Sequence, residues 1–153
     1  MRGGRQKPQM STEQEAALEA LKGAVAEFTA ANQQREELIV EAGEARVPRA
    51  RVEETSGLSR STIWKLWKAA GVPPLPAGTS HLQLSDKQRE ILARLGDAAD
   101  RCRRAEEGYA ENLLNCGRVG VRQTLVADAT GYGRERIRQK WREAGIKPGG
   151  GKS

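Results

Sequence analysis

Positive charge is the chemical feature that most clearly divides this sequence into segments. Residues 46–71 carry six Arg or Lys side chains against two acids, and residues 118–147 carry eight against three. The preceding segments are not basic: residues 11–45 have two bases against eight acids, and residues 85–117 have six against seven. Charge that served only solubility would not segregate in this way. Two basic segments predict a polyanionic partner, most often a nucleic acid.

Side chains suited to catalysis or metal binding are sparse. The single His, His81, falls in a proline-rich stretch and is predicted to be an ordinary linker residue. Cys102 and Cys116 should lie about 21 Å apart along one expected helix, too far for a disulfide, and are predicted to be buried. One His and two separated Cys do not make a zinc site. With no phosphate-binding loop and no nucleophile–base pair, the sequence predicts no enzyme activity, no metal and no cofactor.

Both basic segments belong to an internal repeat with a constant offset of 74 residues. Residues 52–72 return without a gap as residues 126–146, and seven positions are identical. The identical pairs are Val52/Val126, Gly57/Gly131, Arg60/Arg134, Ile63/Ile137, Trp67/Trp141, Ala70/Ala144 and Gly71/Gly145. The same register extends backwards to pairs such as Gln14/Gln88 and Gly43/Gly117. One unit of about 74 residues is therefore written twice.

Each repeat opens with the signals of a long helix. Ser11 with Gln14, and Ser85 with Gln88, have the spacing of capping boxes, and about 30 residues without proline follow each pair. Apolar residues then recur at heptad spacing and predict an apolar seam. In the first helix these are Leu18, Leu21, Val25, Phe28, Ile39 and Ala42, and in the second Leu92, Leu95, Ala99, Cys102, Tyr109, Leu113 and Cys116.

Polar residues interrupt both seams. Asn32 and Arg35 occupy seam positions in the first helix and Glu106 does so in the second, so a break or bend is expected near residues 30–35 and 104–108. Each seam could pack on the C-terminal half of its own repeat, or the two seams could pair within or between chains. Both uses are expected, because two short helices alone would give a thin core.

The basic half of each repeat predicts two short helices joined by a tight turn. Residues 49–56 have helical character, Gly57 favours the left-handed turn conformation, and Ser59 is suited to cap a second helix over residues 60–70. An apolar face on that helix is formed by Ile63, Leu66, Trp67 and Ala70. The second repeat gives the same pattern through Val126, Ala127, Gly131, Tyr132 and Gly133, with its second helix over residues 134–144.

A helix, a glycine-containing turn and a basic helix resemble the helix-turn-helix of bacterial DNA-binding proteins. The phrase SGLSRSTIWKLW is especially similar to the resolvase/invertase-type domains. The resemblance covers about 22 residues in each repeat. Three positions depart from it: Glu53 stands where the family has a small residue, which Ala127 satisfies; Gly133 is a weaker cap than Ser59; and Lys140 replaces Leu66.

The resemblance implies that the second helix of each pair enters the DNA major groove. It assigns outward positions that, in the first repeat, are Ser59, Arg60, Ser61, Trp64, Lys65 and Lys68. In the second repeat they are Gly133, Arg134, Glu135, Arg138, Gln139 and Arg142. Arg pairs with guanine, Gln with adenine, and Lys or Ser commonly holds phosphate. Differences at positions 61/135, 64/138 and 65/139 suggest that the repeats recognise different sequences, and Trp64 is left either at the DNA surface or in an interface.

The predicted fold is therefore all-α, with two tandem repeats that each join a long helix to a helix-turn-helix. The predicted organisation is a basic tail over residues 1–10, units at 11–71 and 85–147 with helix-turn-helix segments at 49–71 and 123–145, a linker at 72–84, and a tail at 148–153. No apolar run approaches the ~20 residues of a membrane span, and no signal peptide is visible. A cytoplasmic, nucleoid-associated protein is expected.

Sequence-specific binding of double-stranded DNA, as a bacterial or phage transcriptional regulator, is the function that these features favour. An alternative class is an assembly, adaptor or DNA-packaging protein whose long helices mediate homo-oligomerisation. A third is an accessory factor of a recombinase or transposase, since the chain contains no catalytic domain of that kind.

Overall fold

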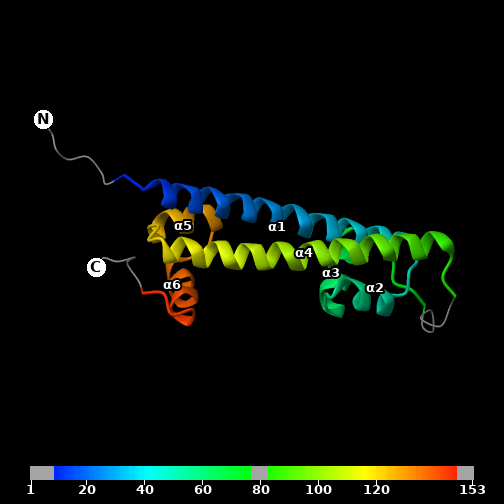
Figure 1. Ribbon diagram of the computed structural model, residues 1–153. Helices are drawn as coiled ribbons and strands as arrows, with labels where there is room; N and C mark the ends of the chain where they lie inside the picture. Colours follow the sequence, from blue (N-terminus) through cyan, green and yellow to red (C-terminus); the bar gives the residue numbers. More distant parts are fainter. Residues whose placement is uncertain (1–8, 77–82, 148–153) are drawn as a thin grey trace, which may run out of the picture. The chain divides into compact units, whose positions relative to one another are not determined.

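The computed structural model describes residues 9–76 and 83–147 (Figure 1). These residues form six α-helices and no β-strand, in agreement with the predicted all-α class. The helices are α1 Thr12–Glu44, α2 Arg49–Ser56, α3 Arg60–Ala69, α4 Asp86–Arg118, α5 Gln123–Thr130 and α6 Arg134–Glu143. None of them is both long enough and apolar enough to cross a membrane. The predicted tails, apart from residues near position 10, lie outside the described residues, as does His81 with the linker positions around it.

Both long helices begin at the predicted capping boxes. The Gln14 amide N–H donates to Ser11 Oγ at 3.0 Å, and the Ser11 N–H donates back to Gln14 Oε1 at 3.0 Å. Ser85 and Gln88 repeat this exchange at 3.1 and 2.8 Å. Each box satisfies two backbone donors that the first helical turn leaves unpaired, which explains why α1 and α4 start where they do.

The predicted break in the long helices is wrong, because α1 and α4 are each continuous over 33 residues. The seam passes through Ala31 and Ala105, which are buried, instead of Asn32 and Glu106. In α4 it uses Ile91 in place of Leu92, which is only half-buried. A shift of one position keeps small apolar side chains on the buried face through the polar stretch, so each helix continues through it.

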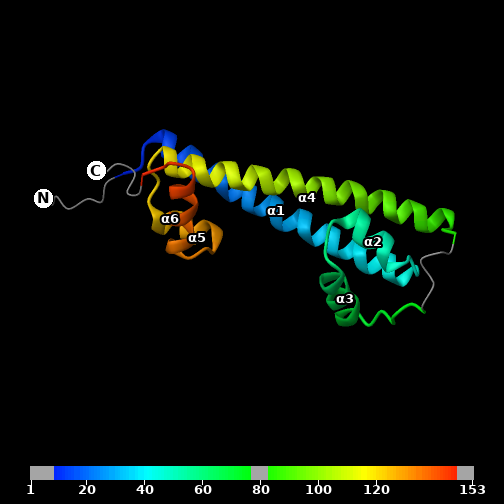
Figure 2. The same ribbon diagram turned by 90° about the horizontal axis from the view of Figure 1, so that it is seen from below.

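The described residues group into two compact units that draw on both repeats. The one-segment unit is Phe28–Glu106, and the two-segment unit combines Met1–Glu27 with Glu107–Ser153. Each unit thus contains the helix pair of one repeat, part of the long helix before that pair, and part of the other repeat's long helix. Figure 2 shows α5 and α6 beside the end of α4 that leads into them.

In the one-segment unit, the parts of α1 and α4 run antiparallel. The Arg94 guanidinium lies 3.1 Å from the Glu41 carboxylate, and seven positions later Arg101 donates to Gln34 at 2.8 Å. Buried side chains from both repeats form one core with α2 and α3. These are Leu38, Ile39, Ala42, Val47, Val52, Ile63, Trp67 and Val72 from the first repeat and Ile91, Leu95 and Ala98 from the second. Each seam therefore packs both on its own helix pair and on the other helix, as expected.

The two-segment unit repeats this arrangement at an offset of 74. Its buried apolar side chains come from α1, from α4, and from α5 with α6. They include Ala17, Leu18, Leu21, Tyr109, Leu113, Cys116, Val121, Val126, Ile137 and Trp141. The Trp141 indole N–H donates to the Leu113 carbonyl at 2.9 Å, as Trp67 donates to Ile39 at 2.8 Å. The shared Trp is therefore a core residue that fixes the second short helix of each pair on its long helix.

The glutamine of each capping box also binds the other repeat. The side-chain amide of Gln88 donates to the carbonyls of Ala45 and Arg46 at 2.9 and 3.2 Å, just beyond the end of α1. Gln14 makes the equivalent bonds at 2.9 and 3.2 Å to Val119 and Gly120, beyond the end of α4. One side chain in each unit therefore caps the start of its own helix and satisfies carbonyls that follow the other.

Gly43 is required by the close approach of the Trp67 indole to α1. A Cβ atom at this position would lie 2.5 Å from Trp67 Nε1, well inside van der Waals contact. We expect Gly43→Ala to displace the indole and to lower the free energy of unfolding by about 2 kcal/mol, the usual scale of core overpacking. Urea denaturation of the whole chain measures this change.

Gly23→Ala is the matched control on the same helix. A Cβ atom there meets nothing within 4 Å, so the change should raise stability by roughly 0.5–1 kcal/mol, because Ala loses less backbone freedom in a helix. Equal urea midpoints of unfolding for Gly43→Ala and Gly23→Ala would contradict the proposed role of Gly43.

Neither Cys102 nor Cys116 forms a disulfide, and both are buried, as predicted. The Cys116 thiol donates to the Ala17 carbonyl at 3.4 Å, and burial raises the pKa of Cys116 to about 11. At pH 8 the folded thiol is therefore protonated and shielded, and we expect a thiol reagent to modify Cys116 only as the protein opens. Labelling followed by mass spectrometry should be slow in buffer and immediate in denaturant.

The raised pKa of Cys116 also sets a direction for the pH dependence. The unfolded thiol ionises first, near its ordinary pKa of 9.0, so its contribution to stability is complete below that pH and declines as pH rises toward 11. Fast labelling of the folded chain at pH 8 would contradict this account.

Candidate nucleic-acid interface

The turn between α2 and α3 is built by three consecutive residues. Gly57 adopts a left-handed conformation with φ of 77°, which residues with a side chain rarely enter. The Leu58 N–H donates to Ser56 Oγ at 3.1 Å, and the Ser59 hydroxyl accepts from the Thr62 N–H at 3.3 Å. The predicted cap at Ser59 is therefore present, and the start of α3 is fixed relative to α2.

The turn between α5 and α6 has the same backbone with different side chains. Gly131 has φ of 79°, and the Tyr132 N–H donates to Thr130 Oγ1 at 3.1 Å. Gly133 supplies no side-chain cap, in line with the weaker cap expected there. The α5–α6 turn therefore depends more on contacts made by Tyr132.

The inward face of α3 is largely the predicted one. Ile63 and Trp67 are buried, and Leu66 is half-buried against the same core. Ala70 is exposed, which corrects the prediction that it belongs to this face. The helix ends at Ala69 and the chain turns away through Gly71 with φ of 76°, so Ala70 is carried out of contact.

All outward residues expected on α3 are exposed. They are Ser59, Arg60, Ser61, Trp64, Lys65 and Lys68. The helix contains three bases and no acid, and Trp64 is 49% exposed, although Trp67 three positions later is only 4% exposed. The Ser59 hydroxyl lies 3.3 Å from that of Ser61 and 3.0 Å from that of Thr62. The outward face of α3 is therefore a continuous surface of cations, hydroxyls and one indole.

The outward face of α6 carries the same net charge with internal ion pairs. The helix has five bases and two acids, and the expected residues Gly133, Arg134, Glu135, Gln139 and Arg142 are exposed while Arg138 is half-buried. Glu135 lies 3.4 Å from the Arg138 guanidinium and 3.8 Å from that of Arg142. Gln139 donates to Glu143 at 3.2 Å. Side chains on α6 are therefore more restrained than those on α3.

A cluster beneath the α5–α6 turn was not anticipated from the sequence. Tyr132 stacks on Tyr109 of α4 with ring centroids 5.7 Å apart, and the Arg136 guanidinium lies 3.9 Å above the Tyr132 ring. Burial, followed by the hydrogen bond with Tyr132, raises the pKa of Tyr109 above its usual range. Helical spacing carried no signal for this cluster, because Tyr132 lies in the turn before α6 and Tyr109 lies on α4. Arg136 therefore supports the turn in addition to adding charge.

The first repeat holds its turn by a different contact. Arg35, at the position equivalent to Tyr109, donates to the Ser56 carbonyl at 3.2 Å and to Asn32 at 3.0 Å. The guanidinium thereby satisfies a carbonyl in the last turn of α2, where the helix dipole favours positive charge. Arg35 thus belongs to the support of α2, although the sequence pattern had placed it as an interruption of the seam.

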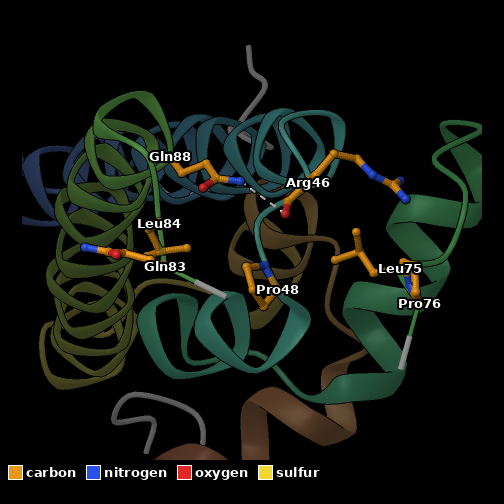
Figure 3. A pocket seen from close by; sticks show the side chains of 7 residues that line it. All are labelled: Arg46, Pro48, Leu75, Pro76, Gln83, Leu84 and Gln88. Carbon is orange, nitrogen blue, oxygen red and sulfur yellow. Dashed lines mark hydrogen bonds between the residues drawn. The ribbon is translucent and has the colours of Figure 1, made fainter. Parts of the chain in front are cut away.

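A pocket of about 360 Å³ lies beside the start of α2 in the one-segment unit (Figure 3). Its lining is Arg46, Pro48, Leu75, Pro76, Gln83, Leu84 and Gln88. Arg46 donates to the carbonyls of Pro73 and Pro74, and Gln88 to those that follow α1, so the guanidinium and this amide already have partners. The lining contains no nucleophile, and the described residues contain no cluster of three potential metal ligands. The exposed faces of α3 and α6 are accordingly the candidate site.

The chain was also compared with known proteins. No family model, no curated protein and no solved structure matches it.

Proposed function

We propose that the chain binds double-stranded DNA through two helix-turn-helix motifs, with α3 and α6 as the helices that enter the major groove. The observation that carries the proposal is the division of faces on α3: Ile63 and Trp67 are held in the core, while every residue expected to meet DNA is exposed. A helix fixed along one side and basic along the other has the arrangement that major-groove recognition requires. The net charge of +3 on each of α3 and α6 supplies attraction to phosphate.

Sequence-specific binding is proposed because the two outward faces are equipped for base contacts. Arg60 and Arg134 are the shared candidates for guanine, and Gln139 is a candidate for adenine. A chain with two different readers suits a site of two unlike halves. A bacterial or phage transcriptional regulator is the class of protein that this arrangement favours.

The alternative as an assembly or adaptor protein depends on apolar surface along the long helices. The seams of α1 and α4 are buried within the chain, and the exposed large hydrophobic side chain of the described residues, Trp64, lies on α3. Burial of the seams leaves the long helices with polar outer faces. These observations favour DNA as the partner.

Titration of random-sequence duplex DNA with the whole chain at several salt concentrations tests the proposal. If α3 and α6 together neutralise about six phosphates, the logarithm of the binding constant should fall with the logarithm of salt with a slope of about −5. Absence of binding at about 50 mM salt would reject the proposal. Selection from a random pool then establishes whether a preferred site exists and whether it has two parts.

A further inference from the structure

Trp64 is an apolar side chain on the exposed face of α3, outside the core. Its indole is 49% exposed, whereas the other large hydrophobic side chains of the described residues are covered to a greater degree. Trp67, on the same helix, already provides the core contact and the hydrogen bond to α1. Leaving an indole in water forgoes the stabilisation of burying it, on the order of 2–3 kcal/mol. A contact with a partner would recover that free energy.

The surroundings of Trp64 identify the partner as an anion. Arg60 lies four positions before it and Lys68 four positions after it, so all three share one stripe along the helix. Ser61 and Lys65 flank the stripe, and α3 contains no acid. An apolar protein surface would have to desolvate these cations, whereas DNA pairs with them through its phosphates. Charge therefore favours DNA as the surface that covers the indole.

The largest apolar group that the base edges offer in the major groove is the C5 methyl group of thymine. The other three bases present mainly hydrogen-bonding groups there, which an indole ring face cannot satisfy. If α3 lies in that groove, the ring is most favourably placed against thymine methyls. Uracil, which lacks only this methyl group, is the natural probe of such a contact.

The second repeat has an arginine at the equivalent position. Arg138 follows Arg134 by four positions and precedes Trp141 by three, as Trp64 follows Arg60 and precedes Trp67. The Glu135 carboxylate lies 3.4 Å from the Arg138 guanidinium, so the side chain is restrained before DNA arrives. A restrained guanidinium suits bidentate pairing with guanine O6 and N7, because less side-chain entropy is lost on binding.

We propose that this position adds a different base preference to each half of the protein: Trp64 selects thymine through its methyl group, and Arg138, held by Glu135, selects guanine. The inference rests on the proposed function of α3 and α6 in DNA binding. It names one residue pair that makes the two halves of the site unlike, on helices that are both fixed to a long helix through a buried Trp.

Base analogues test the inference with the whole chain. A duplex selected from a random pool is synthesised with thymine, and again with uracil at every thymine position. The wild type should bind the uracil duplex about fourfold more weakly for each methyl group that Trp64 contacts, the scale of burying one methyl group. Trp64→Ala should bind the thymine duplex more weakly and should bind both duplexes equally. A version with 7-deazaguanine, which lacks N7, should weaken the wild type by a larger factor than Arg138→Ala, because Arg60 and Arg134 still pair with guanine in that variant.

The outcomes separate failure of this inference from failure of the proposed function. Equal wild-type affinity for the thymine and uracil duplexes, or a uracil effect that persists in Trp64→Ala, overturns the role of Trp64 while DNA binding stands. A change in the mass of Trp64→Ala in solution, with DNA affinity unaltered, also overturns it and assigns the indole to a protein interface. Failure of the wild type to retain any duplex at low salt rejects the proposed function itself. Thermal denaturation of each variant verifies that it is folded.

Discussion

Replacing Arg60, Lys65 and Lys68 together by Glu is expected to weaken binding of duplex DNA by about three orders of magnitude near 0.1 M salt. Lys65 and Lys68 each lose a phosphate contact, whose released counterions are worth roughly 0.9 of a tenfold change in affinity at that salt, and loss of the Arg60 pair with guanine removes about 1–3 kcal/mol more. The salt slope should decrease in magnitude by about 1.8, because two phosphate contacts are lost. Because all three side chains are exposed on α3, the fold should survive the changes. Fluorescence anisotropy titrations at four or five salt concentrations give both quantities.

A charge-matched control separates a local contact from general attraction. Lys22, Lys87 and Arg103 are exposed on α1 and α4, and their replacement by Glu changes the net charge by the same amount. This variant should retain most of the affinity and nearly the full salt slope. If both triple variants lose affinity equally, net charge rather than α3 is responsible, and the assignment of α3 as a DNA-reading helix is wrong.

The isolated second repeat, residues 83–147, is expected to form a homodimer. In the whole chain, the core around Trp141 is completed by the α1 part of the two-segment unit, which contains the buried Leu18 and Leu21. The fragment lacks α1, but a second copy carries Leu92 and Leu95 at the positions equivalent to Leu18 and Leu21. Burial of each such side chain stabilises the fold by about 1.5–3 kcal/mol, so an isolated monomer would lose most of a marginal stability.

The dimer should form contacts equivalent to those that α1 makes in the whole chain. Gln88 of a second copy stands where Gln14 stands in the whole chain, opposite the carbonyls of Val119 and Gly120. Ile91 replaces the smaller Ala17, which adds apolar contact. Sedimentation equilibrium should give twice the fragment mass, and the melting temperature should rise with concentration.

Leu95→Asp in the same fragment provides the control. A charge at this buried position should prevent association and leave an unfolded monomer, because an unpaired carboxylate is costly to bury. A wild-type fragment that is helical, cooperative and monomeric at every concentration would show that a repeat completes its own core. The dependence of each unit on both repeats would then be wrong.

The local features of the fold were predicted correctly from the sequence. Both capping boxes, the two left-handed glycines of the turns, and the bounds of α2 depend on residues within a few positions of one another, and short-range rules capture such features. The burial of Trp67 and Trp141 was also predicted, because each lies four positions after Ile63 or Ile137 and therefore on the same face of its helix.

Features that depend on distant contacts were not predictable in the same way. Ala31 and Asn32 are neighbours in the sequence, and only the packing of α1 against α4 decides which of them enters the seam. The seven-residue pattern placed Asn32 in the seam and therefore predicted a break. In the structure the small Ala31 is buried instead, and α1 is one continuous helix. Each unit contains parts of both long helices, and this too depends on tertiary packing. The offset of 74 alone is compatible with repeats that pack separately and with repeats that pack together.

The outward placement of the candidate residues was predicted from the sequence, but the restraint on their side chains was not. Exposure of Arg60, Lys65 and Lys68 follows from the helical period once Ile63 and Trp67 are buried. The double contact of Glu135 with Arg138 and Arg142 depends on rotamers that spacing does not specify. The stack of Tyr109 on Tyr132 joins α4 to the α5–α6 turn, so only the folded chain reveals it.

The paired glutamine bonds impose an order in which the chain can assemble during synthesis. Gln88 reaches Ala45 across 43 positions, whereas Gln14 reaches Val119 across 105. Closing the longer loop costs only about 0.8 kcal/mol more in chain entropy. The residues up to Val119 must, however, be synthesised before this loop can close. The one-segment unit has all its residues once position 106 has left the ribosome, while Leu18 and Leu21 must wait for α5 and α6. We therefore expect the core around Trp67 to form first in the nascent chain. Leu18 and Leu21 of α1 then stay exposed until the last quarter of the sequence has been synthesised and covers them.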